Sequence, residues 1–280
     1  MYGNDGSSNY EDVHLTADLL YELASPSRCA ILYELLRRGE ARLSYVARVL
    51  NMSMQEAHRN MTRLVDAGLA AKNTNGRFML TEYGILAARQ LDYFMFIAKH
   101  RDLLRSYNVA GVPSMFINRL SELANCRVVL GVSAVLEKLK ALEAGAEEYI
   151  NIIVAQAWYE EGSILIDRLS NGISVRMIFT SSTIVPKEII DSDIPKVMRG
   201  FKIKGTLDTR LVDGVGAAVY ISERQAGLML PNSSGIFDMN MLLLSDDRRF
   251  HTWCNDLFMH YWSSADEVRH GIEGVVKIVE

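Results

Sequence analysis

Apolar residues recur at helical spacing through the first part of the chain and divide it into four predicted helices. Ser25-Pro26 ends the first helix, because a residue before proline is disfavoured in the α region. Ser27 is expected to cap the second helix. Ser53 and Glu56, three residues apart, form the capping box of the fourth helix. The predicted helices cover 11–24, 27–38, 43–50 and 53–67.

Two short apolar runs follow the fourth helix, at 69–72 and 77–80. Between them lies Asn75-Gly76, a dipeptide that favours a tight β-hairpin turn. The order helix, helix, turn, helix, hairpin is typical of a winged helix-turn-helix, whose last helix can enter the major groove of DNA. We therefore predict a winged helix-turn-helix DNA-binding domain over 1–80.

The next segment, 81–107, is predicted to form one long helix. Its five consecutive apolar residues, 93–97, cannot share one face at 100° per residue, so the helix needs a second packing partner. That partner is predicted to be a second copy of the chain. A junction at 111–113 precedes a helix near 114–124, and 81–125 is assigned as a linking and dimerisation segment. The predicted dimer seam consists of Tyr93, Phe94, Phe96 and Ile97.

The remainder, 126–280, alternates short apolar runs with helical segments, which predicts an α/β domain. The predicted strands are 127–132, 149–154, 174–179, 216–221 and 227–230. The predicted helices are 133–144, 156–170, 186–199 and 246–263. The fold class is therefore α/β plus α+β, in which an N-terminal winged helix-turn-helix is joined by a long linking helix to a C-terminal α/β sensor domain.

Charge is distributed unevenly along the chain, whose net charge is −4. Residues 1–25 carry five acidic and no basic side chains, whereas 26–99 carry eleven basic and six acidic ones. A basic segment beside an acidic remainder is expected when one domain binds phosphates and another has a different task. Double-stranded DNA is the predicted partner of the basic segment.

The predicted helix 53–67 has an apolar stripe and an opposite polar face. The polar face offers groups that can reach base edges and phosphates, such as glutamine for adenine and arginine for guanine. The alternative is an ordinary amphipathic helix with a solvated polar face; it is weakened by the adjacent turn, basic hairpin and positive charge. The candidate DNA-binding residues are Arg42, Ser44, Ser53, Gln55, His58, Arg59, Thr62, Arg63, Lys72, Asn75 and Arg77.

Two segments of the predicted DNA-binding domain resemble a known family. Residues 23–32, LASPSRCAIL, resemble the entry into the first helix of ArsR-type winged-helix repressors, and 61–69, MTRLVDAGL, resemble the end of their recognition helix. Metal-sensing members of that family use paired cysteines. No cysteine lies between 30 and 125, so the resemblance does not imply a metal site, and neither a metal nor a cofactor is predicted.

The stretch 149–262 resembles the effector domain of archaeal winged-helix regulators first described in the control of methanogenesis. The resemblance rests on 169–176, 227–229, 235–238 and 247–258. It implies an archaeal regulator and a fold related to the non-catalytic phospholipase-D-like domains of sugar-responsive archaeal regulators.

A phospholipase-D-like fold raises the question of hydrolysis. That chemistry needs a histidine nucleophile with a lysine two positions later. The sequence contains no nucleophile-elbow, P-loop or dinucleotide-binding motif. His251, Cys254 and His260 give too few converging ligands for a metal site. The six histidines are His14, His58, His100, His251, His260 and His270, and none has such a lysine. We therefore predict that the chain is not an enzyme.

A transcription regulator responds to a signal. Polar residues in the α/β domain suggest that this signal is a small polar or anionic effector, or a protein partner. Ligands of open α/β sheets favour the carboxyl ends of strands, where 180–183 would lie. The alternative is a satisfied ion pair and a capping Ser/Thr cluster. The predicted effector-binding residues are Arg176, Thr180, Ser181, Ser182 and Arg210.

The remaining expectations concern partners and location. The N-terminus lacks the features of a signal peptide, and the longest apolar run, near 149–158, is too short to span a bilayer, so a cytoplasmic protein without membrane contact is predicted. A homodimer is expected to read a palindrome. The competing hypothesis is an adaptor of the transcription machinery that contacts proteins rather than bases. Cys29, Cys126 and Cys254 are expected to be buried thiols, with redox sensing as the alternative.

Overall fold

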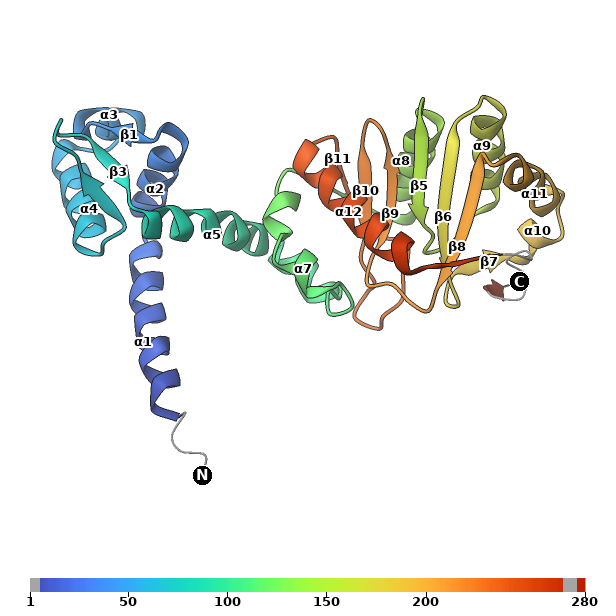
Figure 1. Cartoon of the computed structure of the whole chain (residues 1–280), viewed down its shortest axis with the longest axis horizontal. Coiled ribbons are helices and arrows are strands. Elements are labelled where there is room, and N and C mark those ends of the chain that lie inside the picture. Colours follow the sequence, from blue (N-terminus) through green and yellow to red (C-terminus); the bar gives the residue numbers. More distant parts are fainter. Residues whose placement is uncertain (1–5, 269–275, 280) are drawn as a thin grey trace. The chain divides into compact units, whose positions relative to one another are not determined.

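The computed structural model describes residues 6–268 and 276–279, with side chains from Tyr10 onward. Its contacts divide the chain into two compact units, Met1–Phe94 and Met95–Glu280. Helix α5 (Glu82–Lys99) crosses this division (Figure 1). The predicted domain limits at 80 and 125 stay predictions.

The N-terminal unit is a winged helix-turn-helix, as predicted. Helix α4 packs on α2 and α3, and the strands form an antiparallel sheet in the order β1-β3-β2. Strand β1 was not predicted, because two residues carry no readable periodicity. Before α5 the elements are α1 (Gly6–Leu23), α2 (Pro26–Arg38), β1 (Glu40–Ala41), α3 (Leu43–Val49), α4 (Met54–Asp66), β2 (Ala70–Lys72) and β3 (Phe78–Leu80).

The cap of α2 differs from the prediction. Ser25, not Ser27, is the N-cap: its hydroxyl accepts from the Arg28 amide at 3.4 Å, and Pro26 occupies the first turn. Proline is favoured there because its fixed φ suits a helix and its missing N–H is not needed. The Ser27 hydroxyl instead donates to Glu56 Oε1 at 3.1 Å.

The predicted capping box of α4 is half formed. The Ser53 hydroxyl accepts from the Glu56 amide at 3.1 Å, as the motif requires. The Glu56 carboxylate accepts from Ser27 on α2, so it ties two helices of the motif together.

The core of this unit joins the three helices of the motif. Ile31 and Leu32 from α2, Val46 from α3, and Met61 and Leu64 from α4 are all fully buried in one cluster. Each such side chain contributes about 1.5–3 kcal/mol on burial. The apolar periodicity that predicts the helices therefore also fixes the orientation of α4.

The predicted long helix 81–107 is interrupted at His100. Helix α5 ends at Lys99, and α6 (Arg101–Ser106) follows it. The His100 ring is buried, packs on Phe96 with ring centres 4.8 Å apart and lies 3.8 Å from the Cys126 sulfur. The predicted helix near 114–124 consists of a short α7 (Ser114–Ile117) and a 3₁₀ turn (Leu120–Leu123).

The C-terminal unit is built on an eight-stranded mixed sheet, which confirms the predicted α/β class (Figure 1). Its order is β12-β8-β6-β5-β9-β10-β11-β4; β5, β6 and β8 are parallel, and the other pairings are antiparallel. A separate parallel pair joins β7 (Ile184–Pro186) to β13 (Lys277–Val279). The strands of the large sheet are β4 (Arg127–Leu130), β5 (Tyr149–Ile153), β6 (Ser174–Thr180), β8 (Leu207–Val212), β9 (Ala218–Ser222), β10 (Ala226–Met229), β11 (Met241–Ser245) and β12 (Asp266–Glu267).

Helices cover both faces of this sheet. Helix α12 (Arg248–Ser264) crosses one face, whereas α8 (Val132–Ala144), α9 (Tyr159–Ser170) and α11 (Ile194–Lys204) pack on the other (Figure 1). The predicted helix 186–199 is two helices, α10 (Lys187–Ile190) and α11. Strands β7, β8, β11, β12 and β13 were not predicted.

No helix in the described part of the chain is long and apolar enough to cross a membrane.

Candidate nucleic-acid interface and effector sites

Helix α4 presents the polar face that the sequence predicts. Its buried side includes Ala57, Met61 and Leu64. Ser53 is exposed at the N-terminus of the helix, where free amides favour a phosphate. The exposed side chains of the helix include Gln55, His58, Arg59 and Thr62. Side chains that can hydrogen-bond to base edges therefore lie together on the exposed face of α4, and the buried residues of the same helix fix its position.

Arg63, at the edge of this face, is engaged by α1. Its guanidinium donates to Glu22 Oε1 and lies 5.4 Å from the centre of the Tyr21 ring. The interaction with Glu22 is charge-assisted, which is the stronger class of hydrogen bond. To contact DNA, Arg63 would have to break its interaction with Glu22, whereas the exposed Arg59 side chain is already accessible.

The hairpin that forms the wing is shaped by Asn73. The Asn73 side-chain oxygen accepts from the amides of Asn75 and Arg77, at 3.0 and 2.9 Å, and its amide nitrogen donates to Glu40 at 2.8 Å. Arg77 also pairs with Glu40, at 2.5 Å. Lys72 and Asn75 are exposed. The wing therefore offers one lysine and one asparagine directly, while Glu40 partly neutralises Arg77.

A hollow of about 380 Å³ beside the wing gathers four arginines. The Arg38 guanidinium lies 4.1 Å from the Tyr45 ring centre, a cation–π distance. Arg42 and Ser44 were predicted and meet here, but Arg38 and Arg48 were missed, because they lie on two different helices and only the fold brings them together. The lining is Arg38, Glu40, Ala41, Arg42, Ser44, Tyr45, Arg48 and Arg77.

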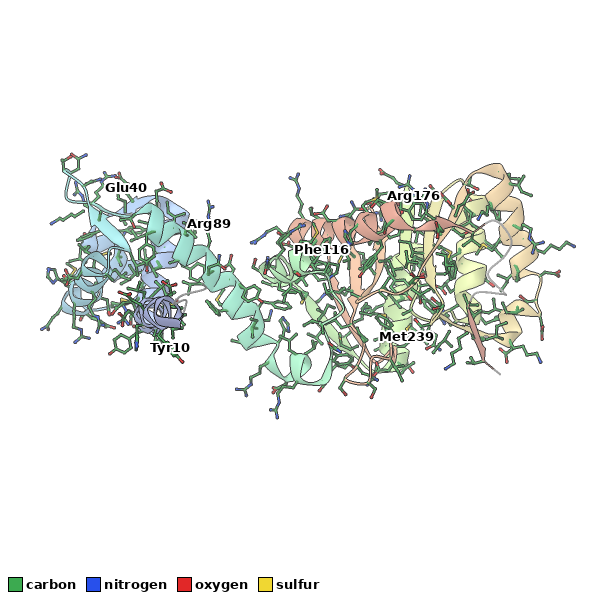
Figure 2. All side chains as sticks on the ribbon, turned by 60° about the horizontal axis from the view of Figure 1, so that its bottom comes forward. Tyr10, Glu40, Arg89, Phe116, Arg176 and Met239 are labelled. Carbon is green, nitrogen blue, oxygen red and sulfur yellow. The ribbon has the colours of Figure 1, made fainter. Side chains whose placement is uncertain are left out.

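The predicted effector residues lie on the adjacent strands β6 and β8 and on the turn after β6. Arg176 (labelled in Figure 2) and Arg210 both lie over the Trp262 ring of α12, at 5.6 and 4.2 Å from its centre. Arg210 also donates to the Trp262 carbonyl at 2.8 Å. Thr180 lies four residues beyond Arg176 on β6, or about 13 Å along the strand. The structure thus groups the two arginines at Trp262. Arg210 pairs in register with Ile178, two residues before Thr180, whereas Arg176 lies farther along the strand.

The hydroxyl cluster 180–183 forms a closed turn after β6. Thr183 is buried, and its hydroxyl donates to the Val154 carbonyl at 2.9 Å. The Thr180 hydroxyl bonds those of Ser182 and Thr183, at 2.8 and 3.2 Å. Ser181 is exposed. The hydroxyls of Thr180, Ser182 and Thr183 thus find hydrogen-bond partners within or next to the turn. This is the arrangement expected if the cluster caps the strand rather than binding a ligand.

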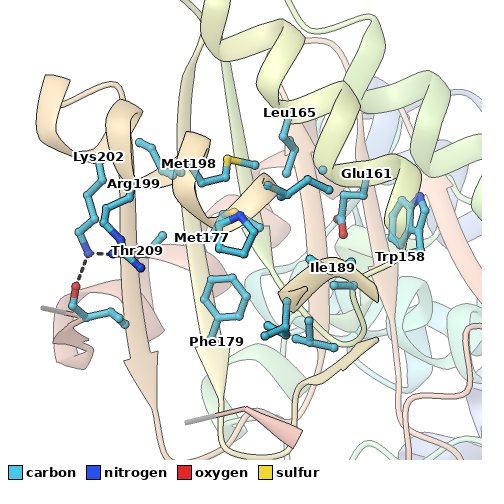
Figure 3. Close-up of a pocket in the computed structure, with 18 residues that line it drawn as sticks. Trp158, Glu161, Leu165, Met177, Phe179, Ile189, Met198, Arg199, Lys202 and Thr209 are labelled. Carbon is cyan, nitrogen blue, oxygen red and sulfur yellow. Dashed lines mark hydrogen bonds between the residues drawn. The ribbon is translucent and has the colours of Figure 1, made fainter. Parts of the chain in front are cut away.

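Figure 3 shows a cavity of about 420 Å³ that Met177 and Phe179 of β6 help to line. Because side chains alternate along a strand, the cavity lies on the sheet face opposite Arg176. Helices α9, α10 and α11 and strands β6 and β8 contribute most of its walls. This site was not predicted from the sequence, in which the available signal was Glu161 among the apolar residues of 156–170. The polar lining is Glu161, Arg199, Lys202 and Thr209, and the rest is Ala157, Trp158, Gly162, Leu165, Met177, Phe179, Val185, Ile189, Ile190, Ile194, Pro195, Met198, Leu207 and Val268.

The three cysteines do not favour redox chemistry. Cys126 and Cys254 are buried, and Cys29 is half-buried. Burial raises the pKa of all three thiols, that of Cys126 to about 11. Reactive cysteines need a thiolate, which burial disfavours here. Among the described residues, no group of three or more histidine, cysteine, aspartate or glutamate side chains could hold a metal; His270 lies outside them.

Comparison with known proteins confirms the resemblance in both units. Residues 23–72 match the family described as "Helix-turn-helix domain", and 148–264 match "Methanogenesis regulatory protein FilR1, middle domain". The chain therefore carries a helix-turn-helix domain and a domain of the methanogenesis-regulator type, which together support a DNA-binding transcription regulator. No curated protein sequence matches the chain.

Several solved structures are similar at low identity. TrmBL2, described as an archaeal chromatin protein with a novel mode of DNA binding, is 13% identical with a TM-score of 0.41, over 87% of this chain and 94% of that one. NucT from Helicobacter pylori is 16% identical with a TM-score of 0.39, over 51% and 99%. Nuc from Salmonella typhimurium, a phospholipase D family member, is 10% identical with a TM-score of 0.38, over 52% and 100%.

Proposed function

We propose that the chain is a sequence-specific transcription regulator whose helix α4 reads DNA and whose C-terminal domain responds to a small ligand. The observation that carries the first half is the exposed row of Gln55, His58, Arg59 and Thr62 on a helix held by its buried stripe. An adaptor surface would instead expose leucines or aromatic rings. The exposed large apolar side chain on α4 is Met54, at its N-terminal end. In this proposal the chain acts in the cytoplasm and has no catalytic role.

Selection of bound duplexes from a random DNA pool at near-physiological salt tests this proposal. Enrichment of a palindrome with half-sites about 10 base pairs apart supports a dimeric, sequence-specific regulator. Salt-sensitive binding without enrichment, in the pure protein and again with cell extract added, would favour the adaptor hypothesis.

Arg59 and Lys72 are expected to play different roles. Arg59→Ala should weaken binding to the selected site by about 1–3 kcal/mol and relax selectivity at one position, because arginine on a recognition helix contacts base edges. Lys72→Ala should weaken specific and random DNA alike and lower the salt slope by about one, because a wing lysine contacts phosphate. Titrations of both duplexes at several salt concentrations measure this. Indistinguishable profiles for the two variants would contradict the division of roles.

Homodimerisation is the expected arrangement on a palindrome. Helix α5 exposes Phe94, Met95 and Ile97, whereas Phe96 is buried and Tyr93 half-buried, so Phe96 leaves the predicted seam. Contiguous apolar surface of this kind marks interaction sites. Exposed apolar side chains on α1 include Tyr10 (Figure 2), Val13, Leu15, Leu20 and Tyr21.

Light scattering at micromolar concentration is expected to give the mass of two chains. Phe94→Asp should shift that mass toward one chain, because it places a charge within the exposed apolar row. Arg89→Ala, an exposed change on the same helix, serves as the control and should leave the dimer intact. A single-chain mass for the unaltered protein would remove the dimer from the proposal.

A further inference from the structure

Four buried side chains of the C-terminal unit carry polar atoms that form no hydrogen bond with the described residues. The atoms are both carboxyl oxygens of Glu143, Oε1 of Glu161, Nε1 of Trp158 and the hydroxyl oxygen of Tyr220. All four residues are more than nine-tenths buried. An unsatisfied polar group is costly away from water, so each atom indicates a place where a partner group would be stabilising.

Two of these side chains, Trp158 and Glu161, line the 420 Å³ cavity. They lie at one end of it, and Lys202 and Thr209 lie at the other, with Met177 between them (Figure 3). Glu161 is 2% exposed, yet its Oε1 remains without a partner in the described chain. The cavity therefore has a defined polar end inside the domain, surrounded by apolar walls.

The opposite end is already satisfied. Lys202 donates to the Thr209 hydroxyl at 2.7 Å and also to the Val268 carbonyl. An anionic ligand would have to displace these contacts to reach the lysine. A ligand that donates to Glu161 Oε1 displaces no described group, and it supplies the hydrogen bond that this oxygen lacks.

We propose that this cavity binds a small apolar molecule carrying one ammonium group, which donates to Glu161 while its hydrocarbon part packs on Leu165, Met177 and Phe179. Two carboxyl groups, those of Glu161 and the neighbouring Glu143, favour a cation at this end, and the Trp158 ring can add a cation–π contact. The proposal names the ligand class for the ligand-sensing role proposed above and rests on it.

The protonation of the empty site is consistent with this assignment. Burial raises the pKa of Glu161 to about 8, although the neighbouring Glu143 carboxyl group opposes the rise. Burial, the charge of Glu161 and the proximity of its carboxyl group raise the pKa of Glu143 well above its usual value. The other titratable groups around the carboxyls and the cavity are Tyr220 on β9, and Arg199 and Lys202 on α11. At neutral pH the carboxyl pair by itself is thus largely protonated, and an entering ammonium group favours loss of the Glu161 proton.

Hexylamine, hexanol and hexanoate form a matched series that tests the ligand class, since they share a chain and differ in the head group. Calorimetric titration into the full chain without DNA is expected to show hexylamine binding at least about tenfold more tightly than the other two, the range for a hydrogen bond between charged groups. Tighter binding of hexanoate, equal binding of all three, or no binding of hexylamine would overturn the proposal.

Glu161→Gln removes the charge while keeping the shape of the side chain. It should weaken hexylamine about tenfold or more and change hexanol by less than about threefold. Glu160→Gln is the control, because Glu160 precedes it on α9 but has a side chain that is 63% exposed; this variant should bind hexylamine normally. Equal amine affinity for Glu161→Gln and the unaltered protein would refute the anchoring role. Because the titrations contain no DNA, an absence of specific DNA binding would not change them. The ligand proposal and the DNA-binding proposal can therefore be refuted independently.

Discussion

Glu161→Gln is expected to stabilise the C-terminal domain against unfolding by about 3–4 kcal/mol more at pH 8 than at pH 5. A glutamate in the unfolded chain has a pKa of about 4.3, whereas burial raises the pKa of Glu161 to about 8 in the folded domain. Between these values only the folded state holds the proton. The stability that this proton contributes is complete below the lower pKa and falls by about 1.4 kcal/mol for each pH unit toward the higher one. Glutamine does not titrate and escapes this loss, while Glu143, whose pKa is raised mainly by its own burial, still titrates in both proteins.

The three tryptophans make the measurement selective. Trp158, Trp253 and Trp262 all lie in the C-terminal unit, so urea unfolding followed by tryptophan fluorescence reports on that unit. Burial lowers the pKa of His100, which changes stability in the opposite direction near neutral pH, but it does so in both proteins and cancels in their difference. Glu160→Gln is the control, because the Glu160 side chain is 63% exposed. Parallel stability curves for Glu161→Gln and wild type would show that Glu161 is ionised in the folded domain.

Gly216→Ala is expected to destabilise the same domain by about 3 kcal/mol or more, the upper range for overpacking. A Cβ at Gly216 would lie 2.0 Å from the carbonyl carbon of Gly111, and backbone atoms cannot move aside as a flexible side chain can. The Gly216 amide also donates to the Tyr261 hydroxyl at 3.1 Å. The substitution would therefore separate the segment around Gly111 from the loop before β9.

Gly214→Ala, two residues earlier in the same loop, is the matched control. A Cβ there would meet no atom within 4 Å, and we expect a change of less than about 0.5 kcal/mol. The same fluorescence-detected unfolding compares both variants. Similar midpoints for the two would mean that the contact between Gly111 and Gly216 contributes little to stability.

The winged helix was predictable because its signals are local. A cap, a glycine, an Asn-Gly turn and a helical stripe each occupy a few residues, and together they specify the order of elements. Two of the missed strands lack such signals. Strand β11, MLLLS, is a short apolar run that periodicity cannot distinguish from a buried helical segment. Strand β8, LDTRLV, carries charges at two of its six positions, because one of its faces lies beside the arginines over Trp262.

The cavity was hidden from the sequence for a different reason. Glu160 and Glu161 are identical and adjacent, and a helical pattern gives each the same default interpretation as a solvated acid. Successive side chains on a helix point about 100° apart. Only the packing of α9 shows that one carboxyl group faces solvent while its neighbour enters the core. Likewise, the sequence analysis put Arg63 near the DNA face, but its partner Glu22 lies 41 residues away along the chain.

Glu22 has a consequence for how α1 and α4 can move. Its carboxylate lies 3.1 Å from the Arg28 guanidinium on α2 and also accepts from Arg63 on α4, so one acidic side chain on α1 contacts both helices. A rotation of α1 that carries Glu22 away leaves the nearly buried Arg28 without this counter-ion and releases Arg63 toward solvent. Energetic coupling of this kind is reciprocal. A phosphate that captured Arg63 would therefore weaken the attachment of α1, and a partner that held α1 in place would keep Arg63 from the phosphate.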